Sequence, residues 1–453
     1  MTITILGAGL SGLACSYYIG HSNCLIFEKN NYVGGHVATH ERDGCFWDEG
    51  PHVSFTKNKI VRDLFTATTK VPILDYPTSV GNWYQGNWIP HPAQTNLYAV
   101  PAPLSSKCLQ DFLQAQENTP LLPPKDYGEW LEIAFGRTFS QTFPAAYTKK
   151  YWTCNPEDLA IDWVGERVSR PNPEIVKEGY SGPPSQNTHY ITNIRYPETG
   201  GFVSFTEGIS DGANVQHAHI LTSIDLKEKV LHFENGHRHY YDKLINTIPL
   251  DQLIQVARNV PEYVALAASQ LRCTSLLLIN VKATGAALVP YHWLYVYDKE
   301  KFSTRITQTH LLSSKNTTEG FIGLQVEVYE SPYRPFTISH EAIKEKVIEE
   351  LIEMKLIEKA CTVHTQYIQH ANVLFDHKRR QSQDVVLDWL SEHGLNREED
   401  DLEPMTDWNN PPSLKQSTIY NAGRFAQWKY FWSDDCIMRG LQLSKAITPD
   451  PMQ

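Results

Sequence analysis

Three glycines near the start of the chain, Gly7, Gly9 and Gly12, have the spacing of a phosphate-binding turn. Gly7 permits a tight turn, Gly9 lets the backbone approach a pyrophosphate, and Gly12 lets a helix and a strand pack closely. An acidic residue, Glu28, follows about 20 residues later, where a carboxylate accepts hydrogen bonds from an adenosine ribose. A glycine-rich turn in another kind of βα unit has no need of that acid. The spacing therefore predicts a dinucleotide site, with Ser11 inside the turn.

Two apolar runs must hold these residues in place. Ile3–Leu6 leads straight into Gly7, and Cys24–Phe27 ends at Glu28, so both runs are predicted as strands with a helix between them. The N-terminus of that helix would offer free N–H groups and the positive end of its dipole to the phosphates. The first part of the chain is therefore expected to form a Rossmann-type domain.

A second glycine motif, Gly34-Gly35-His36, follows a few residues after the acid. It resembles the second glycine motif of FAD enzymes in the amine-oxidase superfamily, where two glycines precede Arg, Asn or His and the backbone again passes close to the phosphates. Ordinary NAD dehydrogenases have no such extension. The resemblance implies that the dinucleotide is FAD and that this motif contacts it, with NAD as the weaker alternative.

A third segment, Ile419 to Arg424, predicts a strand and a glycine turn shortly before a helix over Cys436–Ile447. This segment would return to the first domain, where the helix dipole can stabilise a reduced, anionic flavin ring. The cofactor domain is therefore expected to be discontinuous.

With these segments placed, the chain resembles UDP-galactopyranose mutase and the protoporphyrinogen-oxidase-like flavoproteins almost from end to end, with gaps between residues 180 and 400. Gly50-Pro51-His52 is similar to a mutase loop, which implies that His52 lies against the flavin. Tyr147 and Trp152 are similar to a mutase Tyr-Thr-x-x-x-Trp pair that lines the sugar-nucleotide pocket. Asn96 lies in a stretch similar to the mutase Pro-x-Asn-Leu near the active site.

The resemblance also assigns roles near the C-terminus. Gly423 and Arg424 are similar to a mutase Gly-Arg pair, and Tyr430 to the tyrosine six residues later. In the mutases the arginine touches the FAD pyrophosphate and the tyrosine touches the substrate phosphates. By the same resemblance, His52, Tyr147, Trp152 and Tyr430 form the expected catalytic set.

The chain departs from the mutase pattern where the mutases hold a diphosphate. Trp432 stands in place of an aspartate, Ser303 in place of a tyrosine and Thr274 in place of an arginine. Paired cations and charge-assisted contacts fix a diphosphate, so these departures weaken the mutase assignment. Arg272 and Arg305 are the residues expected to bind substrate instead, and Lys149 and Lys150 could also supply the missing charge.

The 453 residues carry a net charge of −11, with 41% hydrophobic and 20% charged residues. This composition is typical of a soluble globular protein and argues against nucleic acid as a partner. Eight cysteines lie scattered without CxxC spacing. The first strand leaves no room for a signal peptide and no apolar run is long enough to span a bilayer, so a cytoplasmic protein is expected. The sequence does not fix an oligomeric state.

Three other patterns have structural interpretations. An amphipathic helix is predicted over residues 341–357, with an apolar stripe for packing. The acidic segment 397–403 is predicted to be a solvated surface insertion. The alternating histidines of 217–219 and 237–239 suggest a metal site, but they lack further ligands at a supporting spacing, so surface histidines on a sheet and no metal are expected.

The expected fold class is α/β, or α+β overall, with three domains. Residues 1–90, 198–250 and 410–453 would form the discontinuous Rossmann-type FAD domain, 91–197 a mainly helical substrate lobe, and 251–409 an antiparallel sheet with a helix. The expected function is FAD-dependent oxidation of a small molecule, carbohydrate or nucleotide-linked. The alternatives are mutase-like ring contraction of a nucleotide sugar on reduced FAD and a non-catalytic flavin-binding scaffold.

Overall fold

A parallel sheet brings the two ends of the sequence together. The computed structural model describes residues 2–117, 122–165, 170–285 and 289–447. Within these ranges the sheet has five strands, in the spatial order β19 (Ile419–Asn421), β13 (Lys243–Asn246), β1 (Ile3–Leu6), β2 (Cys24–Phe27) and β9 (Val215–Gln216). The two apolar runs that were predicted as strands are confirmed, and they pair in parallel with Ile3 opposite Cys24.

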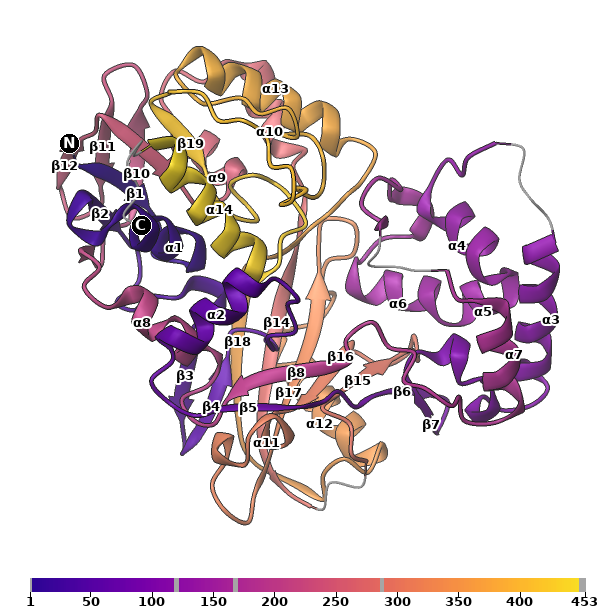
Figure 1. Cartoon of the computed structure of the whole chain (residues 1–453). Coiled ribbons are helices and arrows are strands. Elements are labelled where there is room, and N and C mark those ends of the chain that lie inside the picture. The colour runs from indigo at the N-terminus through magenta and orange to yellow at the C-terminus, as the bar shows by residue number, and fades with distance from the viewer. Residues whose placement is uncertain (1, 118–121, 166–169, 286–288, 448–453) are drawn as a thin grey trace.

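Two helices distant in sequence lie side by side on this sheet, α1 (Leu10–Ile19) and α14 (Ser433–Ile447) (Figure 1). The contact is close because Gly440 of α14 faces the backbone of α1: a Cβ added there would lie 2.6 Å from the carbonyl carbon of Ala14. The predicted C-terminal strand and helix are therefore confirmed, and the last segment does return to the first.

A second layer lies beside β19, which is an edge strand of the parallel sheet. It contains α9 (Leu250–Val256), α10 (Glu262–Ser269) and α13 (Arg379–Glu392), which lie near β19 (Figure 1). A small antiparallel sheet stands beside β2, made of β10 (Leu221–Asp225), β11 (Val230–Phe233) and β12 (Arg238–Tyr240). An Asn235-Gly236 turn joins the last two strands, with Gly236 at a positive φ of 82°.

The second large element is a mixed sheet of seven strands within the described residues, antiparallel except for the pair β15–β6. Its order is β18 (Lys359–Val373), β14 (Cys273–Thr284), β17 (Ile322–Glu330), β16 (Arg305–Gln308), β15 (Trp293–Val296), β6 (Val80–Tyr84) and β7 (Asn87–Pro90). Helix α12 (His340–Glu353) packs on it through the predicted apolar stripe, since Ile343, Val347 and Leu351 are fully buried.

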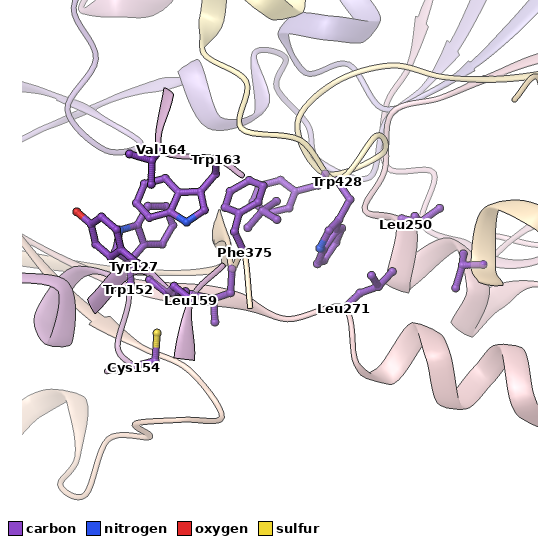
Figure 2. Close-up of a cluster of buried hydrophobic side chains, with 14 of the residues drawn as sticks. Tyr127, Trp152, Cys154, Leu159, Trp163, Val164, Leu250, Leu271, Phe375 and Trp428 are labelled. Carbon is purple, nitrogen blue, oxygen red and sulfur yellow. The ribbon is translucent and has the colours of Figure 1, made fainter. Parts of the chain in front are cut away.

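A helical lobe lies at the far end of this sheet (Figure 1). It contains α3 (Leu104–Glu117), α4 (Tyr127–Phe135), α5 (Arg137–Thr142), α6 (Pro144–Tyr151) and α7 (Pro173–Ser181). An aromatic cluster in which Trp152, Trp163 and Phe375 lie close together joins the lobe to the rest of the molecule (Figure 2). Burial of such large side chains fixes the lobe against its neighbours.

Shorter elements connect these parts. They are α2 (Lys59–Thr68), α8 (Glu207–Ser210), α11 (Thr309–Leu312), and the antiparallel pairs β3 (Thr39–Arg42) with β4 (Cys45–Asp48) and β5 (Ile73–Pro77) with β8 (Asn193–Pro197). The α/β class with a Rossmann-type sheet and a mainly antiparallel sheet is confirmed. No helix in the described ranges combines the length and the apolar character that crossing a membrane requires.

The boundaries within the chain differ from the expected division in two places. Strands β6 and β7 join the seven-stranded sheet, although residues 1–90 were assigned to the cofactor domain. Helices α10 and α13 contact each other beside the parallel sheet, although 251–409 was assigned to the other sheet. The chain therefore passes between the two sheets more often than the expected division into residue ranges assumes.

The prediction that the acidic segment is a solvated insertion is wrong, because its carboxylates neutralise buried cations. Glu398 pairs with Arg439 on α14, and their side chains are only 4% and 1% exposed. Asp400 pairs with the fully buried Lys429 at 2.7 Å, and Asp401 pairs with Arg397 at 2.8 Å. An unpaired buried cation costs free energy of folding. By neutralising Lys429 and Arg439, this segment therefore stabilises the turn before α14 and α14 itself.

Glu398→Ala should lower the free energy of unfolding by about 3–5 kcal/mol, because it leaves Arg439 buried without its carboxylate. Chemical denaturation measures this change. Glu399→Ala is the matched control, since that neighbouring side chain is exposed, and it should alter stability by less than about 0.5 kcal/mol. Equal losses in the two variants would contradict the structural role of the segment.

Candidate functional site

One continuous cavity of about 1710 Å³ lies where the parallel sheet, the mixed sheet and the helical lobe meet. Sites for small ligands usually measure roughly 300–1,000 Å³. This cavity therefore has room for a dinucleotide and a second molecule. Its walls include the N-terminal glycine turn, the second glycine motif, Glu28 and the Gly423-Arg424 turn.

The first glycine turn has the geometry that its sequence predicts. Gly7 has a φ of 98°, and a Cβ added to it would lie 2.4 Å from Thr247 Oγ1. A Cβ on Gly12 would lie 2.1 Å from the Gly7 carbonyl oxygen, so α1 packs closely on β1. At Gly9 the nearest atom to an added Cβ, the Gly35 Cα, is 3.9 Å away. Gly7 and Gly9 line the cavity, whereas Gly12 lies behind them.

The second glycine motif closes onto the first. Gly34 N donates to Ala8 O at 2.9 Å, and Gly34 adopts a φ of 108°. A Cβ added to Gly35 would lie 3.0 Å from Gly9 Cα. Both glycines and His36 line the cavity. The two motifs thus present adjacent stretches of exposed backbone, which suits the close approach of a pyrophosphate.

Glu28 lies at the end of β2, nearly buried and on the cavity wall. Its carboxylate accepts from Ala8 N at 2.7 Å and from Asn30 N at 2.9 Å. These bonds fix the side chain beside the glycine turn, and each carboxylate oxygen has a second lone pair that a ribose hydroxyl could use. The position agrees with the predicted role of Glu28.

The C-terminal turn supplies the opposite wall. A Cβ on Gly423, whose φ is 102°, would lie 2.4 Å from Ser11 Oγ, so the two predicted cofactor residues touch. Arg424 lines the cavity and donates from Nε to Phe431 O at 2.7 Å and from Nη1 to Ala371 O at 3.2 Å. These bonds hold the guanidinium at the cavity wall, where its charge faces the glycine motifs.

Two neutral histidines lie between the glycine motifs and the mixed sheet. Burial lowers the pKa of His36 and of His52 to about 4. The Nδ1 of His52 lies 2.8 Å from Gly50 O, and since a carbonyl only accepts, Nδ1 must carry the proton. His52 Nε2 is therefore the atom with the lone pair, and the residue lines the cavity as predicted.

The far end of the cavity is a tyrosine chamber, lined by Tyr147 and Tyr151 of α6 together with Tyr295, Tyr297 and Tyr329 of the mixed sheet. The rings of Tyr147 and Tyr151 stack at 5.5 Å, and Tyr295 meets Tyr147 edge-on at 5.2 Å. The Tyr147 hydroxyl is buried and has no hydrogen-bond partner within the described residues. Burial raises the pKa of Tyr147 well above its ordinary value, so this hydroxyl stays protonated.

One ion pair lies within the tyrosine chamber. Arg305 donates from Nε to Glu327 Oε2 at 2.5 Å and from Nη2 to Glu327 Oε1 at 2.8 Å. The Glu327 side chain is only 1% exposed. The two strands place these residues directly opposite each other, so the contact is built into the register of the sheet.

Trp152, which belongs to the aromatic cluster of Figure 2, and Tyr430 both line the cavity. Their rings lie 5.8 Å apart, and both also contact Trp163. Trp152 is 5% exposed, so it serves as core packing as well as a wall. The predicted catalytic residues His52, Tyr147, Trp152 and Tyr430 therefore share one cavity.

Two predicted substrate residues are not brought to the cavity wall. Asn96 is buried and donates its amide to Pro92 O at 2.9 Å, while its neighbours Gln94 and Thr95 line the cavity instead. Arg272 lies 3.7 Å from Asp376 and over the ring of Tyr333. The structure does not support a direct contact between either side chain and a ligand here.

The two lysines proposed as substitute cations also lie elsewhere. Lys149 is exposed, and Lys150 is buried with Nζ donating to Ser303 O at 2.7 Å and Asp298 O at 2.9 Å. Burial lowers the pKa of Lys150 to about 7. Ser303 itself donates to the Glu350 carboxylate at 2.6 Å. These contacts connect α6 to the mixed sheet outside the cavity.

His91 is a cavity residue that the sequence reasoning missed. Its Nδ1 lies 2.9 Å from Asn82 Oδ1, and the Asn82 amide donates to the carbonyls of Ile89 and Pro90. Burial holds the pKa of His91 well below its ordinary value. The only available signal was its place at the end of a short hairpin, followed by a proline, and that signal is too general to predict a site.

The paired histidines of the small sheet surround Phe27. His219 Nε2 lies 3.1 Å from His237 Nδ1, and His239 Nε2 lies 2.8 Å from Thr4 Oγ1. Within the described ranges no group of three or more His, Cys, Asp or Glu residues is placed to hold a metal ion. His219 also lines the cavity near Glu28.

Comparison with known proteins supports the N-terminal motif. Residues 5–68 match the family described as an NAD(P)-binding Rossmann-like domain. A 4,4'-diapophytoene desaturase from Staphylococcus aureus strain Newman is 41% identical over 73 residues, which is 16% of this chain and 14% of the desaturase. The chain therefore matches only about one seventh of that relative.

Solved structures extend the likeness to the whole fold. A reduced UDP-galactopyranose mutase superimposes with a TM-score of 0.87 at 22% identity, covering 99% of this chain and 94% of the mutase. A protein from Exiguobacterium sp. 255-15, proposed to be a protoporphyrinogen oxidase, has a TM-score of 0.72 at 16% identity, with 98% of both chains covered. The resemblance inferred from the sequence is thus confirmed at the level of fold.

The buried histidines predict a pH dependence of stability. The pKa of His52 is about 4 in the folded protein and 6.5 when unperturbed, so the unfolded chain binds a proton first as pH falls. The stability contributed by the neutral ring is complete above about pH 6.5 and is lost as pH falls from 6.5 to 4. Urea denaturation between pH 4 and 8 should show this slope, and His52→Gln should reduce it. The exposed His217→Gln control should leave it unchanged.

Proposed function

We propose that this chain is an FAD-dependent enzyme of the oxidoreductase type that acts on a small carbohydrate or nucleotide-linked substrate. The observation that carries the proposal is the single cavity that runs from the dinucleotide cradle to the tyrosine chamber. A cofactor held at one end can therefore reach a substrate held at the other without crossing protein. The cytoplasmic location expected from the sequence stays a prediction, and so does the three-domain division apart from the placement of β6, β7, α10 and α13.

The residues on the cavity wall fit FAD. The two glycine motifs leave the backbone bare where a side chain would fill the cradle, Glu28 is placed for a ribose, and Arg424 offers a positive charge for the pyrophosphate. The proposed cofactor residues are Gly7, Gly9, Ser11, Gly12, Glu28, Gly34, Gly35, His36, Gly423 and Arg424. When bound, FAD supplies two-electron redox chemistry at its ring, which protein side chains do not provide.

The remaining residues of the cavity have distinct proposed roles. His52 is neutral and keeps a lone pair on Nε2, so it can accept a hydrogen bond from a substrate hydroxyl and orient it. Tyr147 keeps a free hydroxyl that can orient the substrate. Trp152 and Tyr430 provide aromatic walls that exclude water. Among the proposed substrate residues, Arg305 lines the cavity, whereas Asn96 and Arg272 can act only through their neighbours.

A second candidate is mutase-like ring contraction of a nucleotide sugar with reduced FAD. The fold shared with the mutase and the presence of Tyr147, Trp152 and Tyr430 on the cavity wall favour it. The substitutions at Ser303 and Trp432 weigh against it, since Ser303 is committed to Glu350 and no longer available to a phosphate. Oxidation is therefore the first proposal.

The test is the visible absorbance of the flavin when purified protein is mixed anaerobically with candidate substrates, including free sugars, nucleotide sugars and amines. Loss of the absorbance with one compound would identify a reductant and support oxidation. If no compound has this effect but chemically reduced protein isomerises a nucleotide sugar, the mutase candidate is correct. A protein purified without flavin that takes up none on reconstitution would exclude both.

Glu28→Arg should abolish flavin retention, because it removes the acceptor for the ribose and for Ala8 N. The ratio of flavin absorbance to protein absorbance measures this effect. Glu41→Arg makes the same charge change at an exposed position on β3 and should keep a full complement of flavin. A flavin-loaded Glu28→Arg protein would refute the assignment of the cradle.

Tyr147→Phe should lower turnover at least tenfold while flavin content and melting temperature stay unchanged, because only an unpartnered hydroxyl is removed. Steady-state kinetics with the substrate found above measures the loss. Tyr98→Phe is the control, since Tyr98 is exposed and lies outside the cavity wall. Unchanged kinetics in Tyr147→Phe would remove this residue from the site.

A further inference from the structure

We infer that the part of the substrate that enters the tyrosine chamber is uncharged and rich in hydroxyl groups, with neither a phosphate nor an ammonium group. This inference rests on the proposed function and narrows its substrate to a sugar or similar polyol that is not linked to a nucleoside diphosphate. The pairing of charges on the cavity wall supports this inference.

The chamber holds one cation, Arg305, and one anion, Glu327, and the two are hydrogen-bonded to each other. Both carboxylate oxygens of Glu327 accept from the Arg305 guanidinium, at 2.5 and 2.8 Å. The pair is bidentate and nearly buried, which is a strong arrangement of charge-assisted hydrogen bonds. The pair carries no net charge, so a substrate phosphate would meet no uncompensated cation here and an ammonium group no uncompensated anion.

The rest of the cavity wall offers no surplus of positive charge. Its described arginines and lysines are Lys29, Arg170, Arg305 and Arg424, and its described carboxylates are Glu28, Glu49, Glu178 and Glu327. The formal charges of these two sets cancel. The FAD diphosphate would then add about two negative charges, so a second diphosphate would enter a cavity that is already negative.

The individual positions of the other cations lead to the same conclusion. Arg424 belongs to the cofactor cradle and donates to two carbonyl oxygens. Lys29 follows Glu28 at the proposed ribose end, and Arg170 is exposed and packs over Trp130 in the helical lobe. Among the described lysines and arginines of the cavity wall, Arg305 is therefore the one bonded within the tyrosine chamber, while Arg424 acts on Tyr151 from the cradle.

The other carboxylates of the cavity wall lie outside the tyrosine chamber. Glu49 accepts through Oε1 from Tyr32, His40 and Gln366 at 2.8–2.9 Å. Glu178 accepts from the backbone of Ser185 in the helical lobe, on the exposed side of the cavity. An amine in the chamber would thus meet Glu327 already neutralised by Arg305, which favours an uncharged group as the occupant.

The chamber instead offers ring faces and hydroxyl groups. The Tyr147 hydroxyl is buried without a partner, and an unsatisfied buried polar group is costly until a ligand bonds to it. Tyr151 donates to Asn372 and Tyr295 accepts from Trp293, so their orientations are fixed. The tyrosine rings can pack on the C–H face of a sugar ring, and the tyrosine hydroxyls can hydrogen-bond to the hydroxyl groups around it.

The experiment is calorimetric titration of flavin-loaded protein, so that the cofactor cradle is filled, with UDP as the anionic probe and putrescine as the cationic probe. The wild-type protein should bind both more weakly than about 1 mM. Glu327→Gln frees Arg305 and should tighten UDP binding at least tenfold, while Arg305→Gln frees Glu327 and should do the same for putrescine. Glu349→Gln, at an exposed position on α12, should bind like wild type.

Two results would overturn the inference. Wild-type protein that binds UDP or putrescine with a dissociation constant below about 0.1 mM has an available charge in the site, and this result does not depend on the folding of any variant. Folded Glu327→Gln protein with unchanged UDP affinity would show that the ion pair does not control the charge of the chamber. Failure of the proposed function would appear separately, as protein without flavin or flavin that no compound reduces.

Discussion

The close backbone contact at Gly12 and Gly440 is the constraint on which the rest of the structure depends. Helix α1 can lie against β1 and α14 only because neither contact has a side chain in the way. With α1 in place, its N-terminal turn meets Gly34-Gly35 on one side and Gly423 on the other, and the bare backbone of three separate segments forms one cradle. The tyrosine chamber is then positioned by the mixed sheet, which meets the same cradle at its edge.

Buried charged side chains are bonded to groups distant in the sequence, two pairs of them to each other and Lys150 to backbone carbonyls. Glu398 holds Arg439 behind the cradle, Glu327 holds Arg305 inside the chamber, and Lys150 joins α6 to the loop before β16. A buried ion needs a partner far more than an exposed one does. These three contacts therefore fix the C-terminal turn, the strand register and the helical lobe relative to one another, and they leave the interior of the chamber without a free charge.

The sequence was sufficient for features that depend on local spacing. The glycine turn, Glu28, β1, β2 and the late strand and helix were all predicted, because each has a short pattern with a specific steric cause. The acidic segment was misjudged because its partners Lys429 and Arg439 lie about 30 and 40 residues away along the chain and look like ordinary surface cations. Arg272, Asn96 and His91 were misjudged or missed for the same reason: their roles depend on which wall of a cavity they face, and tertiary packing alone decides that.

The distance along the chain between the two halves of the cradle also affects how the protein is made. Gly9 emerges early from the ribosome, but Gly423 and β19, which complete the cradle, follow roughly 400 residues later, and at about 5–20 residues per second this delay lasts roughly 20–80 s. During that time β13 lacks its neighbour β19 and the cradle stays open on the side of Gly423. If the chain holds the proposed flavin, its cradle is complete only after Gly423 has been synthesised, and a chain that stops before this residue would lack one wall of the cradle.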